Sequence, residues 1–366
     1  MNNFRQSSQF KLARWLIPIL ITVLLIIFVI YFFNQRQSTT VTTNTSGVKI
    51  TGNDSAEDQY RSIIKDGKYV TSAARGISVS TETQFNAQSF ENSINLVSKK
   101  YFQPSNFIFR EGQILSGNTI QKWLGRYSDS NSKGLNPPDN GRTDNGRSPY
   151  YLQSIIEDDF VEQTSENAVS LRGMTIGFAM NRTDSYTKEQ YGPIYSQDIS
   201  KDEMVVQGKQ IAEKVLKRLR AMKSVKNNLP ILLVMYENAT DDDLVGGEPY
   251  AYYYSRSGSN IGSWSSVDIK NVVFPFSDGS DETVGSAENT TFNNFQDTIK
   301  DFFPTLSTAT ATGRYENGIN TGIQIEINTA FYSTSEMKAL TNYVSSILPS
   351  YFPNTIPVTV SLYGSN

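Results

Sequence analysis

The stretch LRGMTIGFAM (171–180) has the length and apolar content of a buried β-strand. Downstream, Ser200 and Glu203 form a Ser-x-x-Glu capping box, which predicts the start of a helix. That helix carries its apolar residues on one face and ends before PILLVMY (230–236), a second strand of the buried type. The order strand, helix, strand predicts a β-α-β unit, in which we expect the two strands to be parallel.

A second segment near the C-terminus repeats this order. GIQIEINTAFY (322–332) alternates isoleucines at the period of a strand, and STSE (333–336) is another capping box. An apolar helical face follows, and PVTVSLY (357–363) closes the unit. Two β-α-β units predict the α/β class, with an α+β arrangement left open. One interpretation is an internal duplication, and the other is two unrelated units in one α/β protein.

The region before the first unit is less regular. FENSINLVSKKYF (90–102) fits an amphipathic helix, FIFREGQIL (107–115) a strand, and SPYYLQSIIEDDFVEQ (148–163) a second helix. Between the last two lies GLNPPDNGRTDNGRSP (134–149), in which DNGRT is followed directly by DNGRS. Because Asp-Asn-Gly favours tight turns, this segment predicts a long exposed loop, with a binding hairpin as the alternative.

An apolar run near the N-terminus predicts a membrane anchor. Residues 15–33 are 19 uncharged and mainly apolar residues, which as a helix would span roughly 29 Å, the thickness of a bilayer core. Arg5, Lys11 and Arg14 precede the run, and only Arg36 follows closely. The positive-inside rule therefore predicts a single-pass protein of the cell membrane, with a cytoplasmic N-terminus and an extracytoplasmic C-terminal part.

These features predict a division of the chain into four parts. Residues 1–14 form a basic cytoplasmic tail, and 15–33 a transmembrane helix. Residues 34–58 are rich in Ser and Thr and fit a disordered tether. Residues 59–366 form the extracytoplasmic domain, for which a split into lobes 59–165 and 166–366 is an alternative.

The composition excludes several classes of protein. The chain has no Cys and no His, which rules out disulfides, thiol nucleophiles, imidazole bases and the usual zinc sites. Its net charge is −3 and no basic stripe is present, so we expect no binding to nucleic acid. We therefore expect a protein that is not an enzyme and that uses no cofactor or metal.

Seven segments, taken in order, resemble the CamS family, the sex-pheromone lipoprotein precursors of Gram-positive bacteria. They are TSAARG (71–76), FREGQIL (109–115), TIQKWL (119–124), KGLNP (133–137), LRGMTIGFAMN (171–181), KEQYG (188–192) and QGKQIAEKVLKRLR (207–220). The resemblance implies a membrane-attached, extracytoplasmic α/β protein, and it implies no catalytic mechanism. In relatives, a pheromone peptide is released from the signal segment just before a lipidated cysteine. This chain has no cysteine, which leaves a pheromone role open as an alternative.

The resemblance also draws attention to five motif positions of unknown role: Arg75, Gly76, Glu111, Gly112 and Gln113. A turn is the simple interpretation of Arg75-Gly76, and an ion pair or a turn that of Glu111.

Glu111 could also pair with one of the acidic residues 157–159, namely Glu157, Asp158 or Asp159, in the manner of a glycosidase. A carboxylate-dependent cell-wall hydrolase is therefore an alternative function.

Aromatic residues suggest a binding surface in EPYAYYYSRSGSNIGSW (248–264). Tyr252, Tyr254 and Trp264 could stack on the sugar rings of a wall glycan, with Arg256 as a polar contact. The alternative is a strand with Tyr252 and Tyr254 buried on one face.

Two acidic segments, Asp241–Asp243 and Ser277–Glu282, fit solvated turns, with a weak cation site as the alternative. Taken together, the sequence predicts an anchored surface module that binds cell-wall glycan or a surface peptide or protein.

Overall fold

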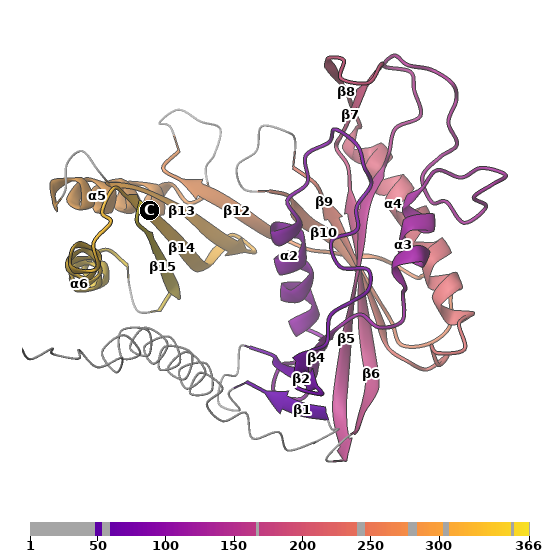
Figure 1. The fold of residues 1–366 in the computed structure, drawn as a ribbon, viewed down its shortest axis with the longest axis horizontal. Helices are drawn as coiled ribbons and strands as arrows, with labels where there is room; N and C mark the ends of the chain where they lie inside the picture. Colours follow the sequence, from indigo (N-terminus) through magenta and orange to yellow (C-terminus); the bar gives the residue numbers. More distant parts are fainter. Residues whose placement is uncertain are drawn as a thin grey trace, which may run out of the picture. The chain divides into compact units, whose positions relative to one another are not determined.

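The computed structural model describes residues 48–52, 59–165, 168–239, 246–276, 284–302, 307–352 and 355–365. The predicted transmembrane run, residues 15–33, lies outside these ranges. Within them, no helix has the length and apolar content needed to cross a membrane. The described part is a mixed α/β structure with two main sheets (Figure 1).

The first sheet has nine strands in the order β1-β2-β4-β5-β6-β9-β10-β11, with β3 paired to β2. The strands are β1 (Val48–Thr51), β2 (Arg61–Lys65), β3 (Lys68–Tyr69), β4 (Ile108–Glu111), β5 (Leu152–Ser165), β6 (Ala168–Met180), β9 (Ile231–Glu237), β10 (Glu248–Ser255) and β11 (Ser265–Ser266).

The first predicted β-α-β unit is confirmed at the centre of this sheet. β6 and β9 are parallel, with Met174 opposite Ile231, and α4 (Lys201–Arg220) makes the crossover. The Ser200 hydroxyl accepts a hydrogen bond from the Glu203 amide and caps α4. The Glu203 carboxylate accepts the hydroxyl of Tyr151, so the reciprocal half of the predicted capping box is replaced by a contact to the sheet.

Helices cover both faces of the centre of the sheet (Figure 1). α3 (Gly117–Leu124) and α4 share one hydrophobic core with Met174, Ile176 and Phe178 of β6. On the other face, α2 (Ala87–Lys99) confirms the helix predicted for 90–102 and packs with β9 and Phe160 of β5.

Two glycines of β6 allow α2 and the segment just after it to approach the strand closely. Gly173 and Gly177 lie on the strand face opposite to Met174 and Ile176, because successive side chains alternate across a sheet. A Cβ atom added to Gly177 would lie 2.6 Å from Ile94 of α2, and one at Gly173 would lie 2.1 Å from the Phe102 ring. Both distances are shorter than van der Waals contact, so the packing requires glycine at these positions.

The second sheet has the order β12-β13-β14-β15 and contains the second predicted β-α-β unit. Its elements are β12 (Ile269–Phe274), α5 (Ser286–Phe302), β13 (Ser307–Glu316), β14 (Ile319–Thr329), α6 (Thr334–Tyr351) and β15 (Val358–Tyr363). β14 and β15 are parallel, and Ser333 and Glu336 form the complete capping box of α6. α5 and α6 share the core of this sheet.

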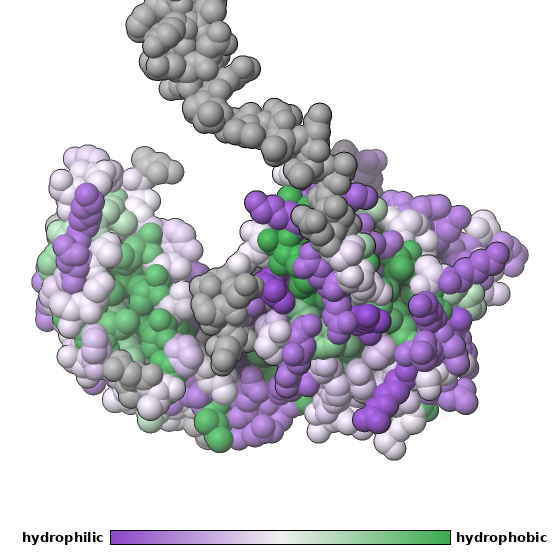
Figure 2. Space-filling model, turned by 90° about the horizontal axis from the view of Figure 1, so that it is seen from below, coloured by the Kyte–Doolittle hydropathy of each residue, from purple (hydrophilic) through white to green (hydrophobic). Residues whose placement is uncertain are grey.

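β15 lies at the edge of the second sheet, and its side chains are at most half-buried. Correspondingly, hydrophobic residues are visible between hydrophilic ones in this part of the molecule when it is viewed from below (Figure 2). A separate hairpin, β7 (Thr183–Thr187) and β8 (Ile194–Asp198), leaves the first sheet between β6 and α4.

Three sequence-based predictions differ from the structure. Residues 148–163 were expected to be helical, but β5 occupies most of this range. Its apolar residues do not alternate because the strand is buried on both faces, and such a run cannot be distinguished from a buried helix by periodicity. β1 lies inside the range predicted as a tether, paired with β2. Finally, a lobe boundary at 165/166 would divide the β5–β6 hairpin, whereas the change of sheet lies between β11 and β12.

We predict that Gly177→Ala lowers the free energy of unfolding by about 1–3 kcal/mol, because the new methyl group forces Ile94 away from the strand. Chemical denaturation of the full-length chain in detergent micelles measures this loss. Gly322→Ala is the matched control, since a Cβ at this strand position would meet no atom closer than 3.6 Å. Equal effects of the two substitutions would contradict the close-packing argument.

Candidate ligand-binding site

A cavity of about 420 Å³ opens between α2, the ends of β4 and β5, and the segment before α2. This volume is within the range of small-molecule sites. Three of the five motif positions singled out from the sequence line it: Arg75, Gly76 and Glu111. Arg75 lies on a tight turn, in which its amide donates to the Ser72 carbonyl at 3.3 Å.

The pairing of β4 with β5 brings two carboxyl groups together at this cavity. In the antiparallel register Glu111 lies opposite Asp158, and Arg110 lies opposite Asp159. Arg110 and Asp159 form an ion pair at 2.5 Å, and the alternation of side chains puts Glu111 and Asp158 on the other face. Two like charges directly opposite each other destabilise a sheet unless other groups compensate them.

Glu111 is compensated on both of its oxygens. Its Oε2 accepts the Ser72 amide at 2.8 Å, and its Oε1 forms an ion pair with the guanidinium of Arg75. Glu111 is 9% exposed, whereas the Arg75 side chain is 58% exposed at the mouth of the cavity. Burial and the charge of Glu111 together raise the pKa of Tyr69 to about 12.

Asp158 has no comparable partner. It is 4% exposed and lines the cavity, and no hydrogen bond or ion pair reaches its carboxyl group from the described part of the chain. Burial raises the pKa of Asp158 to about 8, and the nearby carboxyl groups of Glu91, Asp159 and Glu111 contribute to this rise. Asp158 is therefore a buried acid whose charged form no group in the described ranges stabilises.

Glu157 has a structural role beside the cavity. Its carboxyl group accepts the amides of Gln113 (3.1 Å), Ile114 (2.9 Å) and Leu115 (2.6 Å), and so it holds the loop that follows β4. Burial and the nearby carboxyl group of Asp159 raise the pKa of Glu157 to about 8, while the amides of Leu115 and Ile114 act in the opposite direction.

Gly112 and Gln113 belong to the same loop. A Cβ atom at Gly112 would lie 2.5 Å from the Glu157 side chain, so only glycine fits beneath it. The Gln113 side chain donates to the Thr71 carbonyl at 3.0 Å, which ties the loop to the segment that carries Arg75. These two motif positions shape the cavity rather than line it.

The predicted aromatic binding residues do not form one surface. Tyr252 and Tyr254 pack against Tyr101 on the α2 side of the sheet, with the Tyr254 ring stacked at 4.5 Å. Trp264 packs against Tyr253, with a centroid distance of 6.0 Å, and belongs to the core on the α4 side. Arg256 is exposed beyond the end of β10. The alternative interpretation was a strand with Tyr252 and Tyr254 buried on one face; the two rings do face the same side, but both are half-buried.

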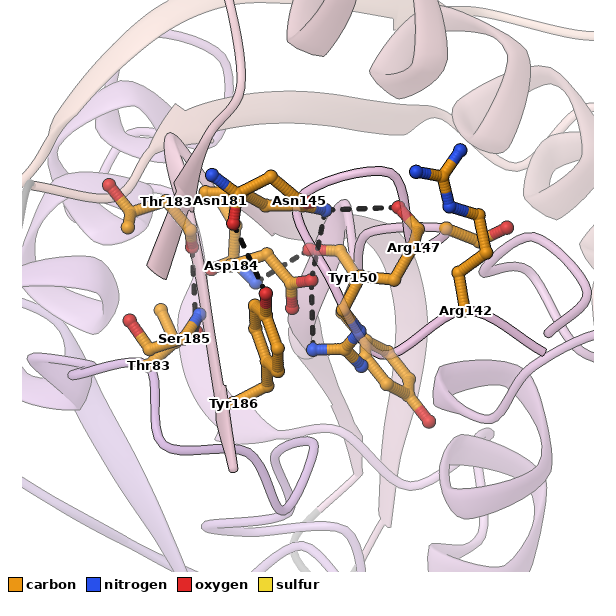
Figure 3. Close-up of polar contacts among 12 residues, drawn as sticks. Thr83, Arg142, Asn145, Arg147, Tyr150, Asn181, Thr183, Asp184, Ser185 and Tyr186 are labelled. Carbon is orange, nitrogen blue, oxygen red and sulfur yellow. Dashed lines mark hydrogen bonds and ion pairs between the residues drawn. The ribbon is translucent and has the colours of Figure 1, made fainter. Parts of the chain in front are cut away.

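The tandem pentapeptide is attached to the β7–β8 hairpin (Figure 3). Arg142 of the first repeat pairs with Asp144, the first residue of the second repeat, at 2.8 Å, and both side chains are exposed. In the second repeat Arg147 pairs with the buried Asp184 at 3.1 Å and lies over the Tyr186 ring. The predicted loop (134–149) is exposed only over residues 138–145, because residues 134–136 are buried at one end and Arg147 anchors the other.

The acidic segments at 241–243 and 277–282 lie outside the described residues. Within the described ranges, no group of three or more acidic side chains is arranged to hold a metal ion. The contribution of α2 to the cavity, through Glu91, Asn92 and Asn95, was not predicted. In the sequence, the only feature that indicates this contribution of α2 is a set of polar residues at helical spacing beside the apolar face of the helix.

Fold and site together define a two-sheet α/β protein with an acidic cavity beside a β-α-β core. The family described as CamS sex pheromone cAM373 precursor matches residues 69–366, and the chain belongs to this family. The resemblance noted in the sequence is thereby confirmed.

Two solved structures are similar to this chain. A sex pheromone precursor from Lactobacillus salivarius subsp. salivarius UCC118 is 43% identical with a TM-score of 0.80, over 87% of this chain and 93% of that one. The C-terminal domain of the sex pheromone staph-cAM373 precursor from Staphylococcus aureus is 25% identical with a TM-score of 0.66, over 77% of this chain and 90% of that one. Among curated proteins, none matches the chain.

The raised pKa of Asp158 predicts a pH-dependent effect of Asp158→Asn. Between about pH 4 and pH 8 the unfolded state has lost this proton while the folded state retains it, so wild-type stability falls as the pH rises. The amide does not titrate. We therefore expect the stability of the variant relative to wild type to increase by about 1–3 kcal/mol from pH 5 to pH 8.

Denaturation curves at both pH values measure this difference, and Asp129→Asn, at an exposed position, is the matched control. Curves of wild type and Asp158→Asn that remain parallel over this range would contradict the raised pKa.

Proposed function

We propose that this protein is a membrane-anchored, extracytoplasmic binding protein and that the cavity beside α2 holds its ligand. The observation that carries the proposal is the carboxyl group of Asp158, which is 4% exposed at the wall of a 420 Å³ cavity and has no hydrogen-bond or ion-pair partner among the described residues. Burying such a group without a partner costs free energy, and a ligand that supplies the missing partner recovers that cost on binding.

The anchor is supported by the sequence alone. The apolar run at 15–33 is long enough to span a bilayer, and the basic residues before it favour a cytoplasmic N-terminus. Membership of a family of pheromone precursors agrees with a protein exposed at the cell surface. The ligand is then a component of the wall or its surroundings, such as a glycan fragment or a surface peptide.

Binding is favoured over catalysis because three of the acidic side chains at the site are already occupied by hydrogen bonds or ion pairs. Asp159 is paired with Arg110, Glu157 accepts three amides of one loop, and Glu111 is held by Arg75. The absence of Cys and His from the chain removes the commonest nucleophiles and bases.

A carboxylate-dependent wall hydrolase is the second candidate, and one observation favours it. Glu111 and Asp158 are cross-strand neighbours, one ion-paired and one with a raised pKa. A retaining glycosidase divides the roles of nucleophile and acid between two carboxyl groups in this way. Glu111 would be the nucleophile and Asp158 the acid.

Release of a pheromone peptide is the third candidate. The similar structures from Lactobacillus salivarius and Staphylococcus aureus are named as sex pheromone precursors. In this chain, such a peptide would come from the N-terminal apolar segment, where no cysteine is present for lipidation.

We predict that Asn92→Trp abolishes ligand binding. Asn92 is an exposed residue of α2 at the wall of the cavity, so an indole at this position occludes the space without disturbing the core. Saturation-transfer NMR with a mixture of muropeptides and tripeptides, on the full-length chain in detergent micelles, is expected to show at least a fivefold loss of signal. Gln88→Trp, on the same helix and outside this cavity, is the matched control.

Absence of any saturation-transfer signal with the wild-type protein would contradict the binding proposal. Turnover of the muropeptides by wild type, lost in Glu111→Gln, would replace it with the hydrolase.

For the anchor, we predict that protein extracted from membranes has the intact mass of residues 1–366 without a lipid, because the chain offers no thiol for lipidation. Mass spectrometry and N-terminal sequencing test this. A mature chain that begins near residue 34 would show that the apolar segment is removed, and a matching peptide in the medium would favour the pheromone precursor.

A further inference from the structure

The ligand class follows from the charges at the cavity, and this inference rests on the proposed binding function. Four carboxyl groups and one guanidinium line the cavity. Two of the carboxyl groups are accounted for, because Glu111 is paired with Arg75 and Glu157 accepts the loop amides. The remaining two, Asp158 of β5 and Glu91 of α2, have no hydrogen-bond or ion-pair partner among the described residues. They are close enough for Glu91 to raise the pKa of Asp158.

The remainder of the lining is largely apolar and aromatic. The rings of Tyr69, Phe85, Phe90 and Phe109 contribute to the wall. Aromatic faces attract cations, and they also bury the hydrocarbon body of a ligand. A cavity with unpaired carboxyl groups and aromatic walls therefore matches a molecule that carries a positive charge on an apolar body.

We propose that the cavity binds an organic ammonium group, carried on an apolar or aromatic body, with its nitrogen between Asp158 and Glu91. The ammonium donates hydrogen bonds to Asp158 and so supplies the partner that this buried carboxyl group lacks. The body of the ligand lies against the aromatic wall.

Other ligand classes fit the same contacts less well. An anion would meet one guanidinium, which Glu111 already neutralises, and two unpaired carboxyl groups. A neutral sugar could exchange hydrogen bonds with both groups but carries no positive charge to pair with Glu91 or with the ionised form of Asp158. A bare metal ion needs more oxygen ligands than these two side chains offer, and no group of three acidic residues in the described ranges is arranged for one.

The affinity must then depend on pH in a defined direction. Asp158 is faced by Glu91 of α2, by Glu111 of β4 with its partner Arg75, and by Tyr60 and Tyr69. Asp159 is its neighbour on β5 and is paired with Arg110.

Because the ion pair requires ionised Asp158, binding below about pH 8 releases its proton, and the affinity rises toward that pH. An alkylammonium, with a pKa near that of lysine at about 10.4, remains charged throughout this range.

Three probes of one shape test the inference on the full-length chain in detergent micelles: 2-phenylethylamine, 2-phenylethanol and 3-phenylpropanoate. Titration calorimetry at pH 6.5, 7.5 and 8.5 is expected to show binding of the amine at least tenfold tighter than of the other two. Its affinity is expected to rise at least fivefold from pH 6.5 to pH 8.5.

Three variants show whether the charge of Asp158 is responsible. Asp158→Asn is expected to lower the affinity for the amine at least tenfold at pH 8.5 and to abolish the pH dependence. Glu91→Gln, on the surface of α2, is expected to lower the affinity for the amine three- to tenfold. This variant tests the charge without changing the buried residue Asp158. Asp129→Asn, which removes an exposed carboxylate elsewhere, is expected to change it less than twofold.

Two further probes distinguish the sources of such an ammonium group. Tight binding of Phe-Gly-Gly, lost in its N-acetylated form, would support the inference and assign the site to a peptide N-terminus. Binding of 2-phenylethylamine without binding of Phe-Gly-Gly would support it for a free amine.

Equal affinity for the amine and the alcohol, unaffected by Asp158→Asn and Glu91→Gln, would overturn the inference. The inference would also be overturned if muropeptides or tripeptides bind, and lose binding in Asn92→Trp, while the amine does not bind. In that case the proposed binding function survives. If no probe of any kind binds, both proposals fail.

Discussion

The close packing of α2 on β6 is the contact on which the rest of the first sheet depends. Gly177 makes room for Ile94 of α2, and Gly173 makes room for the Phe102 ring just after the helix. Between the two glycines Thr175 receives a hydrogen bond from Ser98 of α2 at 2.9 Å, so the helix is also fixed along its axis. With α2 held there, its polar residues at 91, 92 and 95 reach the wall of the cavity beside β5. A helix held farther away would leave Asp158 open to solvent.

Regular elements with strong local signals were predictable from the sequence. The two Ser-x-x-Glu sequences, at Ser200 and Ser333, mark the starts of the helices of both β-α-β units, and the parallel pairing of their strands follows from the crossover. β5 was not predictable in this way. A strand buried on both faces loses the alternation that identifies a strand, and only its neighbours β4 and β6 decide its conformation.

The site was predictable only in part. The sequence indicated the acidic residues, but their roles depend on the register of β4 on β5, which pairs Glu111 with Asp158 and Arg110 with Asp159. Adjacent positions in the chain therefore have opposite properties: Asp159 forms an ion pair, whereas Asp158 is a buried acid with no ion-pair partner in the part of the chain that the structure describes. A shift of register by one residue would exchange these roles, and no local sequence signal specifies that register.

The tandem Asp-Asn-Gly-Arg sequence has a genetic consequence. The arginine of the second copy pairs with Asp184, whereas the arginine of the first copy pairs with Asp144 in the exposed part of the loop. Deleting either copy leaves one Asp-Asn-Gly-Arg after Pro138 and shortens the loop by five residues. This shortening has a small effect on stability, because the closure entropy of a loop changes only slowly with its length. Duplication or loss of this pentapeptide by replication slippage would therefore preserve an arginine for the buried aspartate. Length variation at this position can accumulate among related strains without loss of the fold.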